Sequence, residues 1–356
     1  MEEDNPYRGL PDYAFWRRAV SNVAPDAFDP VTEVPFCIGA DDKIATAGSC
    51  FAQHISRMLA AEGFQYFVTE TAPATSGAEN ENFGTFSARF GNIYTIRQLL
   101  QLFDRSYGLW VPKDISWKRD DGALVDPFRP QIQQGGFATV EALEEDRAAH
   151  LAAVREMFED CDVFIFTLGL TEGWKSDQDG AVFPTAPGVV GTGTGKYAFE
   201  NFRLGNMVDD LKKFLTKLRV VNRAVRVILT VSPVPLVATY EPRHVLLSTT
   251  YSKAALRVVA EIVTASLRNV AYFPSYEIIT GPQARGRYYA DDLREVTPEG
   301  VSHVMSVFKR HYLNKESVKP EPIPAKQNRA VARRAADKKQ LAADFEIVCD
   351  EEILDA

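Results

Sequence analysis

Short, continuously apolar runs alternate with longer amphipathic stretches along most of this chain. Such runs are typical of strands buried on both faces, and amphipathic stretches are typical of helices that cover a sheet. Because parallel strands need a crossover connection, which is usually a helix, this alternation predicts a parallel, doubly wound α/β sheet. The predicted strands lie at residues 43–47, 64–69, 162–168, 226–232 and 269–274.

The predicted helices connect or follow these strands. In the last of them, Thr297 can cap the helix and Pro298 suits its first position. Residues 71–92 are polar and contain glycine, so we expect a functional loop there, and residues 108–140 are irregular. Residues 174–195 have few core-forming residues and predict a mobile loop beside the site. The predicted helices lie at 51–64, 93–107, 140–161, 206–222, 251–267 and roughly 298–312.

The bulk composition bounds the function. The chain has 356 residues, of which 46% are hydrophobic, enough for one large α/β core with insertions. The net charge of −8 argues against a nucleic acid or an anionic membrane as the main partner. No apolar run approaches the ~20 residues that span a bilayer, and the N-terminus lacks the apolar region of a signal peptide. We therefore expect a cytoplasmic protein without membrane insertion.

The sequence carries no pattern for a metal or another cofactor. The four cysteines form no regular framework and predict reduced thiols, and the five histidines lack metal-ligand spacing. The glycine-rich stretch at 188–197 is not a phosphate-binding loop, because Tyr197 follows its lysine and Val190 stands where the first glycine is needed. The cysteines are Cys37, Cys50, Cys161 and Cys349.

Polar and glycine-containing segments follow the predicted strands. Ligands of open parallel sheets bind at the carboxyl ends of strands, so these segments predict one site. A nucleophile after the first strand and acid/base groups after the last is the arrangement of an acyl-transfer site. The segments are 47–50, 167–174, 230–235 and 288–300, and the loop at 88–92 adds a Gly-Asn pair.

Several of these segments resemble the GSCFA family, over most of residues 30–310. They are "GSCFAQHI", "FGNIYTIRQLLQLF", "FIFTLGLTEGW", "ILTVSPVPLVATYEPRHVLLSTTYSKAALR" and "YFPSYEII". That family is similar to the SGNH/GDSL hydrolases, so the resemblance implies a three-layer α/β/α, flavodoxin-like parallel sheet. It also implies hydrolysis or transfer of acyl groups, often on carbohydrates. The resemblance implies an SGNH-like catalytic domain at 41–313. Residues 1–40 are rich in Pro, Asp and aromatic residues and predict an N-terminal arm, and the Lys, Ala and Glu content of residues 314–356 predicts a charged, flexible tail.

The superfamily's first sequence block, laid on Gly48-Ser49-Cys50, places Cys50 at the serine position. A helix N-terminus depresses the pKa of a thiol, whereas a serine needs a strong base. This favours Cys50 slightly over Ser49, and a buried structural role for Cys50 stays open.

The second and third blocks are expected to supply oxyanion and substrate contacts. The second falls on Gly91, with Asn92 beside it, although both could be turn residues. In the third, Thr171 replaces the superfamily's asparagine, and Glu172 could equally be an acid at a helix start. The predicted binding residues are Gly48, Gly91, Asn92, Gly169, Thr171 and Glu172.

The fourth block departs from the superfamily. In the frame that starts at Asp292, Glu295 occupies the position of the usual histidine. A carboxylate is a weak base at neutral pH unless it is buried, so His303 or His244 are alternative bases. His54 is a further candidate, with a structural role favoured for each histidine alone.

The sequence thus predicts an acyl hydrolase (esterase) or O-acyltransferase acting on a carbohydrate or similar small acylated, hydroxyl-bearing substrate, without a cofactor. The rival prediction is a non-catalytic carbohydrate-binding or assembly protein with a degenerate SGNH cleft, which the glutamate at position 295 favours. The exposed position expected for the Gly-Ser-Cys turn favours the enzyme.

Overall fold

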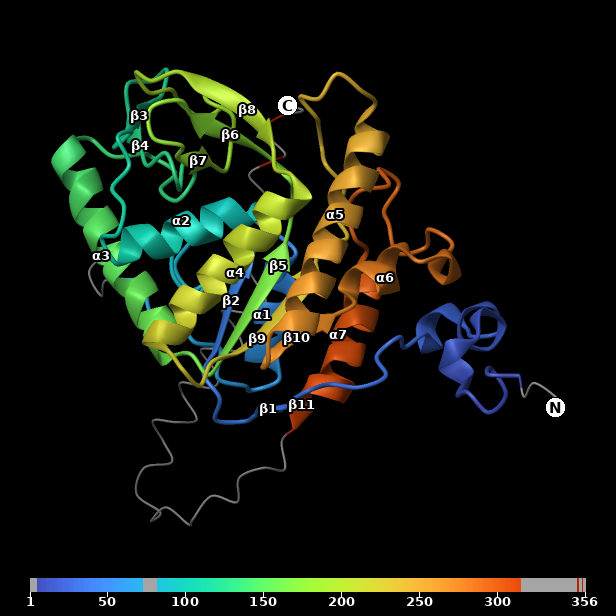
Figure 1. Cartoon of the computed structure of the whole chain (residues 1–356). Coiled ribbons are helices and arrows are strands. Elements are labelled where there is room, and N and C mark those ends of the chain that lie inside the picture. Colours follow the sequence, from blue (N-terminus) through green and yellow to red (C-terminus); the bar gives the residue numbers. More distant parts are fainter. Residues whose placement is uncertain (1–4, 73–81, 315–350, 352–353, 355–356) are drawn as a thin grey trace, which may run out of the picture.

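A four-stranded parallel sheet forms the centre of the molecule (Figure 1). The computed structural model describes residues 5–72, 82–314, 351 and 354. All neighbouring strands of the sheet run parallel, as the apolar runs predict. In spatial order the strands are β10 (Val270–Phe273), β9 (Arg226–Val231), β5 (Val163–Leu168) and β2 (Ile44–Gly48).

The prediction of a full strand at 64–69 is wrong. Only Tyr66 forms a parallel bridge, with Ile44 at the free edge of β2. The chain then turns away, because the Thr69 backbone N–H donates to Ser87 and its hydroxyl donates to Ala153 on a neighbouring helix. With this short edge segment counted second along the chain, the strand order is 2-1-3-4-5, one of the two common doubly wound orders.

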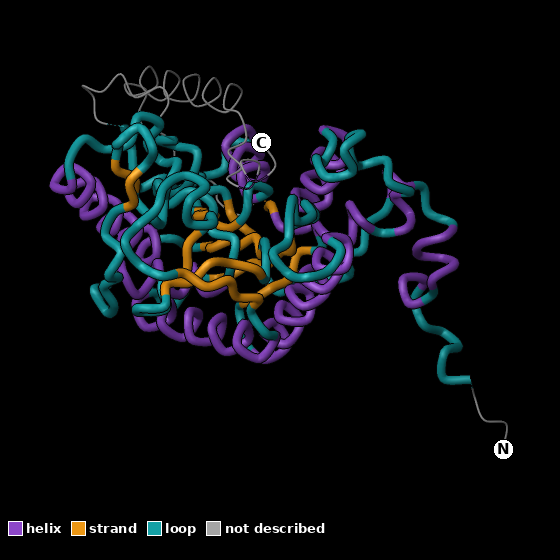
Figure 2. The backbone as a smooth tube through the Cα atoms, turned by 90° about the horizontal axis from the view of Figure 1, so that it is seen from above, coloured by secondary structure: helices purple, strands orange, loops and turns teal. Residues whose placement is uncertain are grey.

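Helices cover both faces of the sheet (Figures 1 and 2). Successive strand residues enter different cores: Phe164 and Phe166 pack on one side, and Val163 and Ile165 on the other. The first side is covered by α2 (Ile96–Ser106), α3 (Val140–Asp160), α4 (Leu204–Val221) and α5 (Val245–Ser266). The second is covered by α1 (Ala52–Ala61), α6 (Ser275–Thr280) and α7 (Pro298–Tyr312). The predicted α/β class is confirmed.

The region predicted as a mobile loop at 174–195 instead contributes to a small antiparallel sheet. This sheet has the order β7 (Val182–Phe183), β6 (Glu172–Ser176), β8 (Tyr197–Asn201). It packs on Trp117, whose ring centroid lies 4.7 Å from that of Phe183. Trp117 belongs to the irregular insertion, which forms the hairpin of β3 (Trp117–Lys118) and β4 (Leu124–Val125). The prediction failed because the core of this sheet comes from a distant segment.

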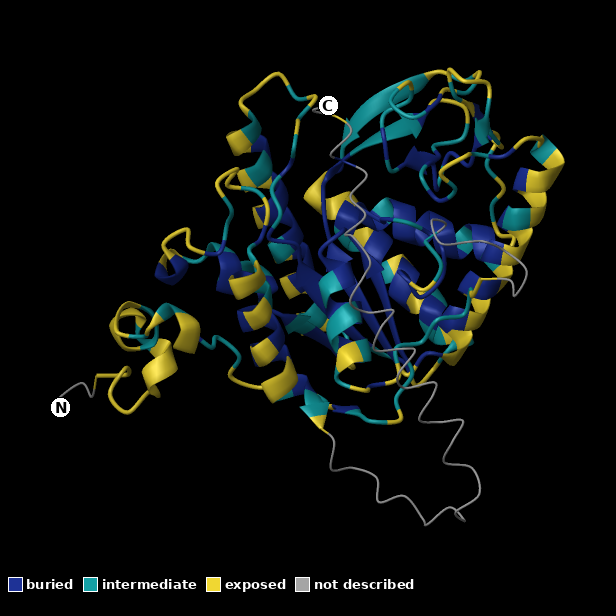
Figure 3. Ribbon diagram, turned by 180° about the vertical axis from the view of Figure 1, so that it is seen from behind, coloured by how far each residue is buried: buried dark blue, intermediate teal, exposed yellow. Residues whose placement is uncertain are grey.

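The N-terminal arm has two halves. Residues 5–22 are mostly exposed and extend away from the body (Figure 3). Phe28 and Ile38 are buried, and β1 (Ile38–Gly39) pairs with β11 (Leu313–Asn314). Short helical turns complete the description: η1 (Asp12–Ala14), η2 (Arg17–Ser21), η3 (Pro25–Ala27) and η4 (Pro282–Ala284). The tail predicted at 314–356 lies outside the described residues, apart from positions 314, 351 and 354.

Two searches of the described residues were negative. None of their helices is long and apolar enough to cross a bilayer. Nor do three or more of their His, Cys, Asp or Glu side chains gather in a metal-binding group.

Candidate functional site

The turn that ends β2 is fixed by a glycine. Gly48 has φ +131°, and a Cβ atom there would lie 2.2 Å from the carbonyl oxygen of Thr167 on β5. The next N–H, of Ser49, donates to that same oxygen at 3.1 Å. The Ser49 and Cys50 carbonyls accept from Ala52 and Gln53 in the first turn of α1. Ser49 and Cys50 therefore occupy a tight strand-to-helix turn, at the end of α1 where the helix dipole favours negative charge.

Both candidate nucleophiles are buried in this turn. Ser49 is 4% exposed and Cys50 is 6% exposed. The hydroxyl of Ser49 has no hydrogen-bond partner among the described residues. A buried hydroxyl without a partner costs free energy, so it marks a place where the fold does not optimise stability.

The loop after Gly91 threads between the ends of β2 and β5. The Ile93 N–H donates to Gly48, and the Tyr94 carbonyl accepts from Gly169 and Leu170. A Cβ at Gly169 would lie 3.1 Å from the Ser49 Cβ. The Asn92 side chain is buried and accepts from Gln53 of α1 at 3.5 Å. The structure thus brings the predicted residues Gly48, Ser49, Asn92 and Gly169 together.

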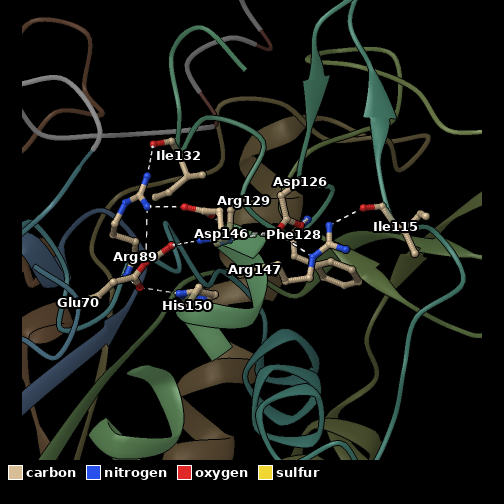
Figure 4. Close-up of polar contacts among 10 residues, drawn as sticks. All are labelled: Glu70, Arg89, Ile115, Asp126, Phe128, Arg129, Ile132, Asp146, Arg147 and His150. Atoms are coloured by element: carbon tan, nitrogen blue, oxygen red, sulfur yellow. Dashed lines mark hydrogen bonds and ion pairs between the residues drawn. The ribbon is translucent and has the colours of Figure 1, made fainter. Parts of the chain in front are cut away.

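Gly91 adopts φ +70° and lines a small cavity with Asn92 and Arg129. A buried ionic network holds the backbone that leads into it (Figure 4). The Arg89 N–H donates to Glu70 at 2.7 Å, and its guanidinium donates to Asp146. This network positions the loop that carries Gly91 and Asn92.

The network continues along α3. Arg129 pairs with both Asp126 and Asp146, and Arg147 pairs with Asp126. Burial alone would raise the pKa of Asp126, but the surrounding guanidinium groups hold it well below its usual range. Nδ1 of His150 lies 2.7 Å from Oε2 of Glu70, within hydrogen-bond distance. Burial lowers the pKa of His150 to about 4. Sequence reasoning missed this network, because its members come from separate segments.

Helix α5 adds a lysine that sequence reasoning also missed. Lys253 is 1% exposed, and its Nζ donates to the Gly169 carbonyl at 2.8 Å. Its neighbour Ser252 accepts from the N–H of Thr171 at 3.1 Å. Burial lowers the pKa of Lys253, while the charges of Glu351 and Cys50 oppose this shift and Arg294 adds to it. The signal in the sequence was a lysine on the apolar stripe of an amphipathic helix.

A carboxylate from the C-terminal part of the chain completes this cluster. Glu351 is buried, and its Oε2 lies 3.3 Å from Nη2 of Arg294. Lys253, Arg294, Glu351 and Cys50 therefore interact electrostatically at the carboxyl end of the sheet.

The two predicted carboxylates of the fourth block lie in an exposed turn. Asp292 Oδ1 accepts from the N–H groups of Arg294 and Glu295 at 3.0 Å each. These bonds lower the pKa of Asp292. Glu295 is exposed as well. The turn directs Arg294, rather than its carboxylates, toward Glu351.

The candidate histidines are engaged in structural contacts. Both ring nitrogens of His303 lie 2.8 Å from partners, the Tyr288 hydroxyl and the Phe28 carbonyl. His244 caps α5 by accepting from the Leu246 N–H. The ring of His54 packs on Phe51, and burial together with Arg57 lowers the pKa of His54 to about 4.

Glu172 begins β6 beside a group of aromatic rings. Thr239 donates to both of its carboxylate oxygens, at 2.8 and 3.0 Å, and burial raises the pKa of Glu172. Two residues further on, the Trp174 ring lies 4.9 Å from that of Tyr240, and Phe199 contacts both. Tyr240 is 69% exposed, so this aromatic trio presents a surface to solvent.

Comparison with known proteins places the chain in one family. No curated protein matches the sequence significantly. Residues 43–308 match the family model described as the GSCFA family. The match includes the Gly48-Ser49-Cys50 turn, Lys253 and Arg294, but not Glu351. Because the matched region makes up most of the sequence, this chain belongs to the GSCFA family.

Proposed function

We propose that this protein is an acyl hydrolase or O-acyltransferase in which Cys50, or else Ser49, takes up the acyl group and Lys253 moves the proton. The observation that carries the proposal is the fully buried amine of Lys253 at the nucleophile turn. An amine whose pKa is lowered by burial is partly neutral near physiological pH, so it can accept a proton. Serine–lysine pairs perform this chemistry in other hydrolases.

In the proposed reaction, the neutral amine of Lys253 takes the proton from the Cys50 thiol. The thiolate sulfur attacks the ester carbonyl carbon, and the bond from that carbon to the alcohol oxygen then breaks. The alcohol oxygen leaves with the proton from the Lys253 ammonium, and a thioester remains. Water or an acceptor hydroxyl next gives its proton to Lys253 and attacks the thioester, which releases the acid or the new ester and restores the thiol. The same steps apply to the Ser49 hydroxyl.

Several features support stabilisation of the oxyanion. The nucleophile turn lies at the N-terminal end of α1, where backbone N–H groups and the helix dipole favour negative charge. Asn92 lies beside that first turn, in contact with Gln53. Gly91 directly precedes Asn92 in the chain, and the family resemblance implies that Gly91 contacts the oxyanion.

The relation to the SGNH/GDSL hydrolases belongs to the same proposal. Its support is the 2-1-3-4-5 strand order, the helices on both faces, and a nucleophile turn directly after the first strand of the sheet. The fourth block does not support it, because Asp292 and Glu295 lie in an exposed turn.

We propose a carbohydrate as the hydroxyl-bearing substrate. The support is the aromatic trio of Trp174, Phe199 and Tyr240, of which Tyr240 is exposed and Trp174 lies two residues beyond Glu172 on β6. Aromatic faces pack on the apolar C–H face of a sugar ring, while tyrosine and tryptophan edges hydrogen-bond to its hydroxyls.

The test is turnover of a panel of acyl esters that includes p-nitrophenyl acetate and acetylated sugars. Cys50→Ala and Lys253→Met should each lower kcat/KM by at least about 100-fold, because each removes a group that reacts in the transition state. Ser49→Ala should lower it only modestly. Lys213→Met, at an exposed position on α4, is the matched control and should leave turnover unchanged.

The pattern across the two alanine variants decides between the nucleophiles. If Ser49→Ala abolishes turnover and Cys50→Ala does not, Ser49 is the nucleophile. If both alanine variants retain full activity, neither residue carries the chemistry.

A second function, a non-catalytic carbohydrate-binding or assembly protein, is favoured by the exposed turn of Asp292 and by the structural contacts of His303 and His244. Sugar binding by wild type without turnover of any ester or transfer to any acceptor would favour this alternative.

A further inference from the structure

The site contains two cations whose anionic partner comes from outside the matched family region. Lys253 and Arg294 lie within residues 43–308, whereas Glu351 lies beyond them. Glu351 Oε2 is 3.3 Å from Arg294 Nη2, and the side chain of Glu351 is only 8% exposed. The charge of Glu351 also acts on Lys253, which is fully buried.

A cation that has lost most of its water requires an anion. Removing one partner from such an ion pair leaves an uncompensated charge, which is strongly unfavourable. The folded domain that carries Lys253 and Arg294 therefore presents a place where a carboxylate is favoured. This place is close to the Gly48-Ser49-Cys50 turn, because Lys253 donates to Gly169, where a Cβ would lie 3.1 Å from the Ser49 Cβ. In this chain Glu351 supplies that carboxylate.

We propose that Lys253 and Arg294 form a carboxylate-binding subsite beside Cys50, and that Glu351 occupies it as an internal competitor of the substrate's carboxylate. The substrate then carries a carboxylate close to its reacting ester or hydroxyl, as an acidic sugar does. A guanidinium suits this role because it binds a carboxylate through two parallel N–H groups. The inference rests on the proposed function in taking the Gly48-Ser49-Cys50 turn as the reacting position. It uses the protonated form of Lys253, which predominates below the lowered pKa of about 8, whereas the proposed reaction uses the neutral fraction.

The experiment compares alkylation of Cys50 by iodoacetate, which carries a carboxylate, with alkylation by neutral iodoacetamide. Peptide mass spectrometry separates Cys50 from the other three cysteines. Glu351→Gln should raise the ratio of the iodoacetate rate to the iodoacetamide rate about tenfold or more, because a charge-assisted hydrogen bond to Arg294 and Lys253 then favours the anionic reagent. Glu144→Gln, at an exposed position on α3, changes net charge equally and is the control, with an unchanged ratio expected.

A second substitution locates the effect. Adding Arg294→Gln to Glu351→Gln should return the ratio toward the wild-type value. If Glu351→Gln accelerates both reagents equally, Glu351 only covers the thiol and the subsite is refuted. If the ratio does not change at all, the subsite is refuted too.

A binding measurement keeps the test decisive where Cys50 is too buried to alkylate. Sodium acetate, compared with sodium chloride at equal ionic strength, should raise the melting temperature of Glu351→Gln and leave wild type unchanged. Equal effects of the two salts on Glu351→Gln would refute the subsite. Neither readout requires turnover, so an inactive wild type in the ester panel would refute the proposed function alone.

Discussion

Gly48 sets the geometry of the Gly48-Ser49-Cys50 turn at the scale of a single residue. Its φ of +131° lies in the region that favours glycine, and its missing side chain lets the turn approach β5. Many glycines of this chain have a positive φ, but Gly63, for example, has no atom near the position of a Cβ. The two positions therefore separate the cost of the backbone conformation from the cost of the steric conflict.

Gly48→Ala should destabilise the protein by more than about 3 kcal/mol, because a Cβ would lie 2.2 Å from the Thr167 carbonyl oxygen and the strand ends must separate. Gly63→Ala, at φ +79°, should cost about 1–2 kcal/mol, the conformational penalty alone. Urea denaturation of both variants measures the difference. Equal losses would show that the close approach of the turn to β5 is not under steric constraint.

At the scale of elements, the buried ionic network joins pieces of chain that are separate in sequence. Glu70 follows the edge segment, Arg89 precedes the Gly91 loop, and His150 lies on α3. Burial alone would raise the pKa of Glu70, but the hydrogen bond from His150 and nearby positive charges lower it to about 2. The pKa values of Glu70 and His150 in the folded protein both differ from their ordinary values, which the unfolded chain retains. The free energy of unfolding therefore depends on pH.

The lowered pKa of His150 makes the folded protein less stable as the pH falls. Its folded pKa of about 4 lies below its ordinary value of 6.5, so the unfolded state binds the proton first as the pH falls between these values. Wild type should therefore lose about 2–3 kcal/mol more than His150→Gln between pH 7 and pH 4.5. Glu70 adds its own loss only below its ordinary pKa of 4.5, as the pH falls toward 2.

Urea denaturation at several pH values measures this difference. Val220→Ala, at an exposed position without a titratable group, is the control and should follow the wild-type pH profile. Parallel profiles for wild type and His150→Gln would contradict burial of a neutral His150.

At the scale of the whole molecule, the N-terminal arm contributes unevenly to the fold. Tyr7, Tyr13 and Trp16 are exposed, whereas Phe28 and Ile38 are buried against the core of α1 and α7. The arm is also held there by the bond between the Phe28 carbonyl and His303.

Deletion of residues 1–22 should change the melting temperature by less than about 3 °C, because residues 5–22 bury little apolar surface. Deletion of residues 1–39 should lower it by more than about 8 °C, since it removes two buried apolar side chains worth about 2 kcal/mol each and the pairing of β1 with β11. Calorimetry compares the two. A large loss on the shorter deletion would show that residues 5–22 pack on the molecule.

Local patterns in the sequence determined the main features of this fold. Continuous apolar runs predict β2, β5, β9 and β10, because a strand buried on both faces carries its own signal. The cap of α7 is local as well: the Thr297 hydroxyl accepts from the Gly300 N–H at 3.2 Å, as its sequence predicts. The strand-to-helix turn at Gly48-Ser49-Cys50 is local for the same reason, since it directly follows an apolar run.

Only the tertiary structure decided the surroundings of that turn. Lys253 reaches Gly169 across 84 positions of sequence, Glu70 reaches His150 across 80, and Arg294 reaches Glu351 across 57. The edge segment at Tyr66 and the sheet packed on Trp117 likewise depend on partners from other segments of the chain. Hydrophobic periodicity and helix capping depend only on residues a few positions apart in the sequence. A buried amine or carboxylate acquires its charge state from groups that folding brings to it, and no local pattern records which groups those are.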